Sequence, residues 1–308
     1  MKVTVKVPAT TANIGPGFDC LGLALPIYNE ITIEETILPG TGIEINIIDE
    51  NEEFETLSIP TDENNIVYKA VELLYNSIGQ TPSELKISIR TRIPIAKGLG
   101  SSASVIVGGL IAANKLLGTP ADEAALLSIA TEVEGHPDNV APAILGGFVL
   151  SSQEEDGSIV YRKLPWPKDW KITVCVPDYE LATEISRSVL PEKVDLKDAS
   201  FNARRCAMLV EAIHTKDSNL LRLALEDKLH QPYRMKLVPG LKEIIEKLRH
   251  EENVLGCVLS GAGPAIIVFS QGNGLDRIRD IVYQTWFDLN VRSEIKTLEI
   301  EEQGAVII

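Results

Sequence analysis

A segment rich in glycine and serine has the residue types and the spacing of a phosphate-binding loop. It reads Pro94-Ile95-Ala96-Lys97-Gly98-Leu99-Gly100-Ser101-Ser102-Ala103-Ser104. A strand pattern over 85–90 leads into it, and an almost charge-free helix pattern follows it and ends near 117–118. Two glycines let the backbone turn tightly and approach an anion without Cβ obstruction. Because the serines stand where a helix N-cap belongs, the first-turn N–H groups and the positive end of the helix dipole should face a phosphate.

The spacing of this loop matches neither of the common nucleotide fingerprints. A Walker loop has a lysine after its second glycine, and Ser101 follows Gly100 here. A dinucleotide loop has a third glycine, and Ala103 stands where it would fall. The alternative interpretation is an ordinary Gly-Ser turn that ends a strand. The long apolar helix directly behind the loop favours the anion site.

A second cluster, at 8–19, places the polar pair Asn13 and Asp19 among two glycines and two prolines after the first predicted strand. A wide surface turn is the alternative interpretation. The apolar neighbours Phe18, Cys20 and Leu21 instead imply a partly buried loop. A buried aspartate costs several kcal/mol unless it has a partner, so we expect Asp19 to be functional.

A third cluster, at 132–139, brings three carboxylates, the imidazole of His136 and the amide of Asn139 to a predicted helix end. Carboxylates here could hold Mg²⁺, which prefers oxygen ligands and keeps several waters; the alternative is a polar loop that ends the helix. A fourth segment, 259–264, links two apolar strands through Ser260, Gly261 and Gly263. Hairpin geometry alone explains much of it, although two glycines also suit a close backbone approach to a ligand.

Regular elements must position these clusters. Period-two alternation predicts strands over 2–7, 30–36, 42–48 and 85–91, and helical spacing predicts helices over 65–78 and from Thr119, as N-cap, to about Glu132. A composition shift at 157–170 indicates a domain boundary, which we place after residue 165. Beyond it we predict strands over 171–176, 254–259, 265–270 and 293–300 and helices over 200–214, 218–230, 240–250 and 275–289. Without the extra helices the order is β-α-β-β-α-β, the split βαβ or ferredoxin-like order.

Composition narrows the class of protein. A length of 308 residues suggests two domains, and the 44% hydrophobic and 24% charged residues are those of an ordinary globular protein. The net charge of −15 disfavours nucleic-acid binding. Repulsion of an anionic nucleotide is screened beyond ~8 Å at physiological salt. Local positive groups, namely Lys97, the helix N-terminus and a bound divalent cation, would therefore decide nucleotide binding.

The chain also carries signals about its compartment. No apolar run reaches the ~18 residues that a membrane span needs, and residues 1–7 alternate like a strand without a signal-peptide core. Four scattered cysteines without a Cys-x-x-Cys pair argue for reduced thiols and against a zinc site. We expect a cytoplasmic protein that does not associate with membranes.

Taken together, the clusters resemble the motifs of the GHMP kinases, which appear here in order at 8–19, 94–104 and 259–264. The resemblance implies an α+β fold with a left-handed βαβ, ATP-binding N-terminal domain (1–165) and a ferredoxin-like C-terminal domain (166–308). It implies ATP and Mg²⁺ as cofactors and phosphorylation of a small-molecule hydroxyl. Within the family, 8–19 and 134–143 are similar to the members that act on L-homoserine in threonine biosynthesis. A homodimer is also implied.

The resemblance assigns roles to individual residues. It implies that 94–104, with Gly261 and Gly263, binds ATP and that Ser102 and Glu134 hold Mg²⁺. Asn13 and Asp19 would bind the ammonium and hydroxyl ends of homoserine. The remaining substrate-binding residues would be His136, Asn139, Thr183, Arg187 and Arg234, the two arginines forming a fork for the carboxylate.

One residue departs from the related mevalonate kinases, which have a catalytic aspartate near the position of Asn139. An amide cannot act as a base at neutral pH. We therefore expect catalysis by alignment, with Asn139 and Asp19 at the reacting centre and Asp19 orienting the hydroxyl and accepting its proton late. Two alternatives stay open: another family kinase that acts on mevalonate or a sugar, and a catalytically silent family member that serves as a regulatory module.

Overall fold

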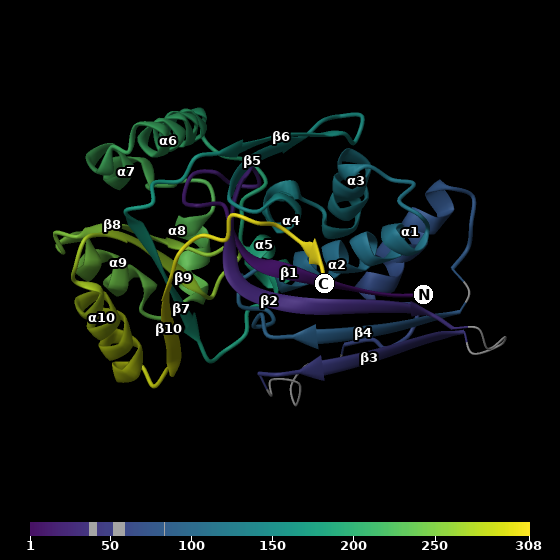
Figure 1. Ribbon diagram of the computed structural model, residues 1–308. Coiled ribbons are helices and arrows are strands. Elements are labelled where there is room, and N and C mark those ends of the chain that lie inside the picture. Colours follow the sequence, from purple (N-terminus) through teal and green to yellow (C-terminus); the bar gives the residue numbers. More distant parts are fainter. Residues whose placement is uncertain (37–41, 52–58, 83) are drawn as a thin grey trace.

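A seven-stranded sheet forms the larger half of the computed structural model, which describes residues 1–36, 42–51, 59–82 and 84–308 (Figure 1). Its strands are β1 (Lys2–Ala12), β2 (Leu21–Glu35), β3 (Ile43–Asp49), β4 (Leu85–Thr91), β5 (Phe148–Gln153), β6 (Ile159–Leu164) and β11 (Val306–Ile307). The order is β11-β1-β2-β4-β3, and β5 pairs with both β2 and β6. Among the described strands of this sheet, only β3 and β4 run parallel, and α1 (Ile66–Ser77) lies between them in the chain. They form the βαβ unit that the family resemblance implies.

Four helices cover this sheet. They are α1, α2 (Ser101–Leu116), α3 (Glu123–Glu134) and α4 (Pro137–Leu145), which in Figure 1 lie above β1–β4 and below β5 and β6. Alternate strand residues such as Val5, Ile31 and Ile87 are buried against them. The apolar α2 lies inside this core, which explains why its sequence is almost free of charge.

The second sheet is antiparallel and has the strand order β10-β7-β9-β8. Its strands are β7 (Trp170–Pro177), β8 (Val254–Leu259), β9 (Ile266–Gln271) and β10 (Ser293–Leu298), with α9 (Leu241–Arg249) and α10 (Leu275–Asp288) packed on it. This is the ferredoxin-like arrangement, so the predicted split βαβ order is confirmed.

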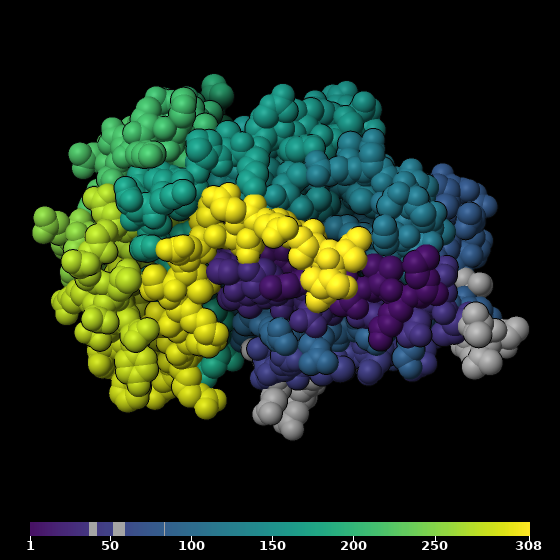
Figure 2. Space-filling model, viewed as in Figure 1, coloured from purple at the N-terminus to yellow at the C-terminus, as the bar shows by residue number. Residues whose placement is uncertain are grey.

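Additional helices between β7 and β8 carry parts of the site. They are α5 (Thr183–Ser188), α6 (Leu196–Thr215), α7 (Ser218–Ala224) and α8 (Gln231–Arg234), followed by a short 3-10 helix, Met235–Leu237. A shared core of buried residues from both sheets, among them Leu23, Phe148, Trp170 and Ile172, joins the two halves. The chain end crosses the first strands in Figure 2, because Ile307 of β11 pairs with Val5 of β1. The division at residue 165 stays a prediction.

Several element boundaries differ from the prediction. Strand β2 begins at Leu21 rather than 30, because residues 21–25 are buried on both faces and show no alternation. Residues 8–12 belong to β1, and β5, β6 and α4 were not predicted. Helix α4 starts with Pro137 and contains Pro142, so its sequence reads as a break.

Helix ends differ as well. Helix α3 has Asp122 as its N-cap, not Thr119, because the Asp122 side chain accepts the Ala125 N–H at 2.9 Å. The predicted helix over 218–230 ends at Ala224. Within the described ranges no helix is long and apolar enough to cross a membrane. The four cysteines are free thiols.

Candidate functional site

A cavity of about 270 Å³ collects most of the predicted site residues from both halves of the molecule. The predicted residues on its wall are Asn13, Asp19, Pro94, Ile95, Ala96, Gly98, Leu99, Gly100, Ser101, Ser102, Glu134, His136, Asn139, Thr183, Arg187, Arg234 and Gly261. The wall does not include Lys97, Ala103, Ser104 or Gly263. Residues more than 200 positions apart in the chain thus share one cavity.

The glycine-rich loop follows β4 and has a backbone that only small residues allow. Ala96, Gly98 and Gly100 all have positive φ, at 53°, 78° and 67°. A Cβ on Gly98 would lie 2.2 Å from the Ser260 carbonyl oxygen, and one on Gly100 would lie 1.9 Å from Thr10 Oγ1. The two glycines are therefore required by close packing against 8–12 and 259–264, as well as by their conformation.

The start of α2 corrects the predicted capping. Gly100, in the left-handed region, is the N-cap and no side chain caps the helix. Ser101 and Ser102 are instead the first two helical residues, and both line the cavity. Because no side chain caps the helix, the first-turn N–H groups, which form the positive end of the helix dipole, are left for a ligand. This is the arrangement that binds phosphate.

Three residues of the loop segment are buried and do not line the cavity. Ala103 and Ser104 are fully buried, and Ser104 Oγ donates to the Ser101 carbonyl at 2.7 Å while it accepts from Asn29 Nδ2 at 2.8 Å. The Lys97 side chain is 3% exposed. Ser104 therefore holds the start of α2 in place, and the phosphate-binding roles of these residues stay predictions.

Ser102 and Glu134 face each other across the mouth of the cavity. Ser102 Oγ donates to Glu134 Oε2 at 2.8 Å. Burial raises the pKa of Glu134, and the hydrogen bond from Ser102 partly opposes that rise. A hydroxyl and a carboxylate at this distance suit Mg²⁺, which takes one or two protein oxygens and completes its shell with phosphate oxygens and water. The residues present therefore fit the implied ion.

A hydrogen-bonded chain crosses the start of α4. Thr10 Oγ1 donates to Asn139 Oδ1 at 2.8 Å, Asn139 Nδ2 donates to Asp138 Oδ1 at 3.3 Å, and His136 Nδ1 lies 2.7 Å from the same Asp138 oxygen. Burial acts to lower the pKa of His136, but the Asp138 carboxylate outweighs it and the net shift is upward. Both ends of the Asn139 amide are thus engaged, so this side chain orients its neighbours.

The segment that carries Asn13 and Asp19 is a left-handed turn after β1. Asn13, Ile14, Gly15 and Asp19 have φ values of 70°, 43°, 75° and 57°. Asn13 Oδ1 accepts the Asp19 N–H at 3.0 Å, and Asn13 Nδ2 donates to the Gly261 carbonyl at 2.9 Å. The turn therefore fixes the position of Asp19 on the cavity wall.

Arg187 on α5 pairs with Asp19. Its Nη2 lies 2.8 Å from Asp19 Oδ1 and its Nη1 lies 3.3 Å from Oδ2, a two-bond fork between half-exposed side chains. The expected carboxylate partner of Arg187 was the substrate, and the structure gives it a protein carboxylate instead. Thr183, at the first position of α5, lies on the same wall.

Arg234 is a buried cation that faces the cavity. The residue is 1% exposed, and its donors reach the Ser186 carbonyl (Nε, 3.2 Å), His230 Nδ1 (Nη1, 3.3 Å) and the Gly261 carbonyl (Nη1, 3.2 Å). Burial, and next the charge of Arg187, lower the pKa of Arg234 to about 10. Among the described residues it forms no ion pair within 4.0 Å. Such a cation suits an anionic ligand.

Sequence reasoning assigned no site role to three polar residues near the cavity, namely Thr10, Asp227 and His230. His230 was placed inside a predicted helix, although the proline two positions after it signals a helix start instead. Thr10 lies inside the second cluster but is hidden in a strand. Their roles depend on contacts across more than 100 residues of sequence, as in the bond between Thr10 and Asn139.

Comparison with known proteins agrees with this geometry. Residues 65–147 match the family described as GHMP kinases N terminal domain, and residues 209–288 match GHMP kinases C terminal. The chain belongs to the GHMP kinase family, so the resemblance seen in the motifs is confirmed.

Relatives within that family narrow the comparison. The chain is 43% identical to the homoserine kinase of Moorella thermoacetica over 304 residues, which cover 99% of both chains. It is 40% identical to that of Carboxydothermus hydrogenoformans, covering 99% of this chain and 96% of the relative. A crystal structure of homoserine kinase from Cytophaga hutchinsonii aligns with a TM-score of 0.88 at 29% identity, covering 100% of this chain and 97% of the other.

Proposed function

We propose that this protein is an ATP-dependent kinase that phosphorylates the side-chain hydroxyl of L-homoserine and forms O-phospho-L-homoserine for threonine biosynthesis. One observation carries the proposal: a single cavity has a helix N-terminus at one wall and a carboxylate with two guanidinium groups at another. The first suits the phosphates of a nucleotide, and the second suits an amino acid with a hydroxyl. Full-length relatives at about 40% identity that are named homoserine kinase support the same substrate.

The residues divide the work as follows. The first-turn N–H groups of α2 and the backbone of the glycine-rich loop hold the phosphates. Ser102 and Glu134 would hold Mg²⁺, and the ion would supply positive charge that neutralises the transferred phosphoryl group. Phosphoryl transfer through a loose transition state depends mainly on positioning and on charge neutralisation. Asn139 has no basic atom, so Asp19 orients the substrate hydroxyl and accepts its proton late.

Substrate recognition falls to the charged groups at the other wall. Arg234 binds the carboxylate, since it lines the cavity and forms no ion pair within 4.0 Å among the described residues. Arg187 holds Asp19 and contributes positive charge to the same carboxylate. Asn13 binds the ammonium end, and His136 and Thr183, which line the same cavity, complete the substrate site.

An assay of ADP release over homoserine, mevalonate, galactose and shikimate tests the assignment. We expect turnover with homoserine and none above background with the other three. Turnover with mevalonate or galactose in place of homoserine would move the protein to another branch of the family. Nucleotide binding without turnover of any of the four would make it a silent regulatory member.

We further propose a cytoplasmic homodimer that binds neither nucleic acid nor membranes. The family resemblance supports the dimer, and the net charge of −15 argues against nucleic acid. Light scattering of the purified protein measures the oligomeric state directly, and a mass of one chain, 33.6 kDa, would refute the dimer.

A further inference from the structure

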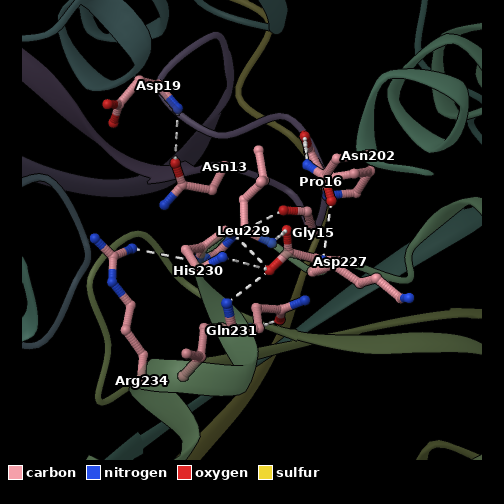
Figure 3. Close-up of polar contacts among 12 residues, drawn as sticks. Asn13, Gly15, Pro16, Asp19, Asn202, Asp227, Leu229, His230, Gln231 and Arg234 are labelled. Carbon is pink, nitrogen blue, oxygen red and sulfur yellow. Dashed lines mark hydrogen bonds and ion pairs between the residues drawn. The ribbon is translucent and has the colours of Figure 1, made fainter. Parts of the chain in front are cut away.

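His230 connects two parts of the cavity wall that lie far apart in the sequence. The side chain is fully buried. Its Nε2 lies 2.7 Å from the Gly15 carbonyl oxygen, and its Nδ1 lies 3.3 Å from Nη1 of Arg234. Figure 3 shows the imidazole between Arg234 and the segment that carries Asp19. One ring therefore contacts both the binding arginine and the backbone that presents the catalytic carboxylate.

The two neighbours fix the protonation state of His230. A carbonyl oxygen only accepts, so Nε2 carries the hydrogen, and a guanidinium only donates, so Nδ1 is bare. The charged groups that face the ring are Arg234, the Asp227 carboxylate at 3.5 Å from Nε2 and, less directly, Asp19. Burial, the largest effect, lowers the pKa of His230. The ring is thus neutral, with a donor toward Gly15 and an acceptor toward Arg234.

Asp227 fixes the turn that carries His230. Its buried carboxylate accepts three backbone N–H groups, from Leu229 at 2.9 Å, His230 at 3.0 Å and Gln231 at 2.6 Å (Figure 3). Because the carboxylate is occupied by these bonds, the backbone at 229–231 has little freedom. The backbone that carries the imidazole is therefore held in place.

Phe18 covers the ring from the side of the substrate segment. Its ring centroid lies 5.2 Å from that of His230 at an interplanar angle of 23°. The guanidinium carbons of Arg234 and Arg187 lie 5.4 and 5.7 Å from the centroid of the same phenyl ring. Residues 13–15 all have positive φ, a backbone that external contacts must stabilise. The hydrogen bond from His230 to Gly15 is one of these contacts.

We propose that His230 is a positioning residue for the amino-acid substrate: as a neutral bridge it sets the spacing between Arg234 and the segment that presents Asp19. This inference rests on the proposed function. Removal of the acceptor for Arg234 should raise the KM for homoserine about tenfold or more, as expected for a hydrogen bond to a charged group. The KM for ATP should not change, since the polar and ring partners of His230 described above, Gly15, Asp227, Arg234 and Phe18, all lie outside the glycine-rich loop.

Two variants separate the two hydrogen bonds of the ring. In His230→Gln the amide N–H replaces Nε2, so the bond to Gly15 is kept and the acceptor for Arg234 is lost. In His230→Asn the amide oxygen replaces Nδ1, so that acceptor is kept and the bond to Gly15 is lost. Homoserine is compared with 3-amino-1-propanol, which lacks the carboxylate, as a substrate or as an inhibitor. His250→Gln, at an exposed position on the protein surface, is the matched control.

We expect His230→Gln to raise the KM for homoserine about tenfold or more and to change the KM or inhibition constant of 3-amino-1-propanol by no more than about twofold. His230→Asn should weaken the binding of both compounds, because the segment that holds Asp19 loses its hydrogen bond from residue 230. An equal effect of His230→Gln on the two compounds, or no effect on homoserine, would overturn the proposal. A residue with a merely structural role would lower the unfolding temperature without distinguishing the compounds.

A measurement on the wild-type protein does not depend on whether the variants fold. The ¹⁵N chemical shifts of the imidazole should report a neutral ring with its hydrogen on Nε2 from pH 7 to 8, and an imidazolium or an Nδ1–H tautomer would refute the bridge. Failure of the proposed function looks different. If the wild-type enzyme does not phosphorylate homoserine, that proposal fails whatever the tautomer is.

Discussion

Replacement of Arg234 by methionine is expected to abolish tight homoserine binding while it leaves the folded state about as stable as before. The guanidinium is 1% exposed and has only neutral hydrogen-bond partners among the described residues. Burial lowers its pKa from 12.5 to about 10. At about 1.4 kcal/mol per pKa unit, the charged form is destabilised by about 3 kcal/mol in the folded state.

The sign of this effect follows from linkage. The folded-state pKa is depressed, so the penalty is present in full at pH 7 and falls only as the pH rises through about 10. Methionine removes the penalty but leaves the Ser186 carbonyl and His230 Nδ1 without a donor, which costs about 1–3 kcal/mol for each group. The two contributions are of similar size, so the free energy of unfolding should change by no more than about 3 kcal/mol. Removing one partner of a compensated buried ion pair would instead cost about 3–5 kcal/mol.

Binding should respond very differently. A lost charge-assisted hydrogen bond is worth about 1.5–3 kcal/mol, so the KM for homoserine should rise roughly 10- to 150-fold while the KM for ATP stays the same. Homoserine should raise the unfolding temperature of the wild-type protein and not that of Arg234→Met. Urea unfolding and steady-state kinetics measure the two effects. Destabilisation above about 4 kcal/mol, or an unchanged KM for homoserine, would refute the proposal that Arg234 is a buried cation that binds the substrate carboxylate.

Three further variants probe the rest of the cavity. Gly100→Ala places a Cβ 1.9 Å from Thr10 Oγ1 and should raise the KM for ATP more than about tenfold. The control Gly118→Ala is also at positive φ but has open space around it, so it should affect only stability. Equal kinetics in the two variants would contradict this. Glu134→Gln should raise the Mg²⁺ concentration for half-maximal activity about tenfold or more, read from a magnesium titration, and an unchanged titration would exclude Glu134 as a ligand. Asp19→Asn should lower turnover more than about tenfold with the fold intact by circular dichroism, and a smaller loss would remove Asp19 from the chemistry.

The sequence was sufficient to predict the fold and the site where a residue type has a single physical reason to be present. Gly98 and Gly100 were expected in a loop that needs a close approach of the backbone to a ligand. Both have positive φ, and a Cβ at either position would clash with a neighbouring backbone or side-chain atom. The strands and helices of the second half had clear periodicity, and the predicted split βαβ order was correct. Ser102 and Glu134 were expected together on the strength of the resemblance and are hydrogen-bonded.

The sequence was insufficient where the structure overrides local signals. Residues 21–25 are strand residues buried on both faces, so they give no alternation, and α4 contains two prolines that normally mark a break. The partner of Arg187 was also not predictable, because the Asp19 carboxylate reaches it across 168 residues of sequence. Distant pairs of this kind arise from the packing of the two halves of the molecule, which no local pattern records.

The Gly261 carbonyl shows why the family motifs occur together. It accepts hydrogen bonds from Asn13 Nδ2 at 2.9 Å and from Arg234 Nη1 at 3.2 Å. The same turn meets the nucleotide loop, since Ser260 Oγ donates to the Gly98 carbonyl at 2.6 Å. The third motif therefore joins the segment that carries Asn13 and Asp19, the Arg234 side chain and the glycine-rich loop. A change of its path would move all three at once, so the turn is constrained by geometry even apart from any contact with ATP.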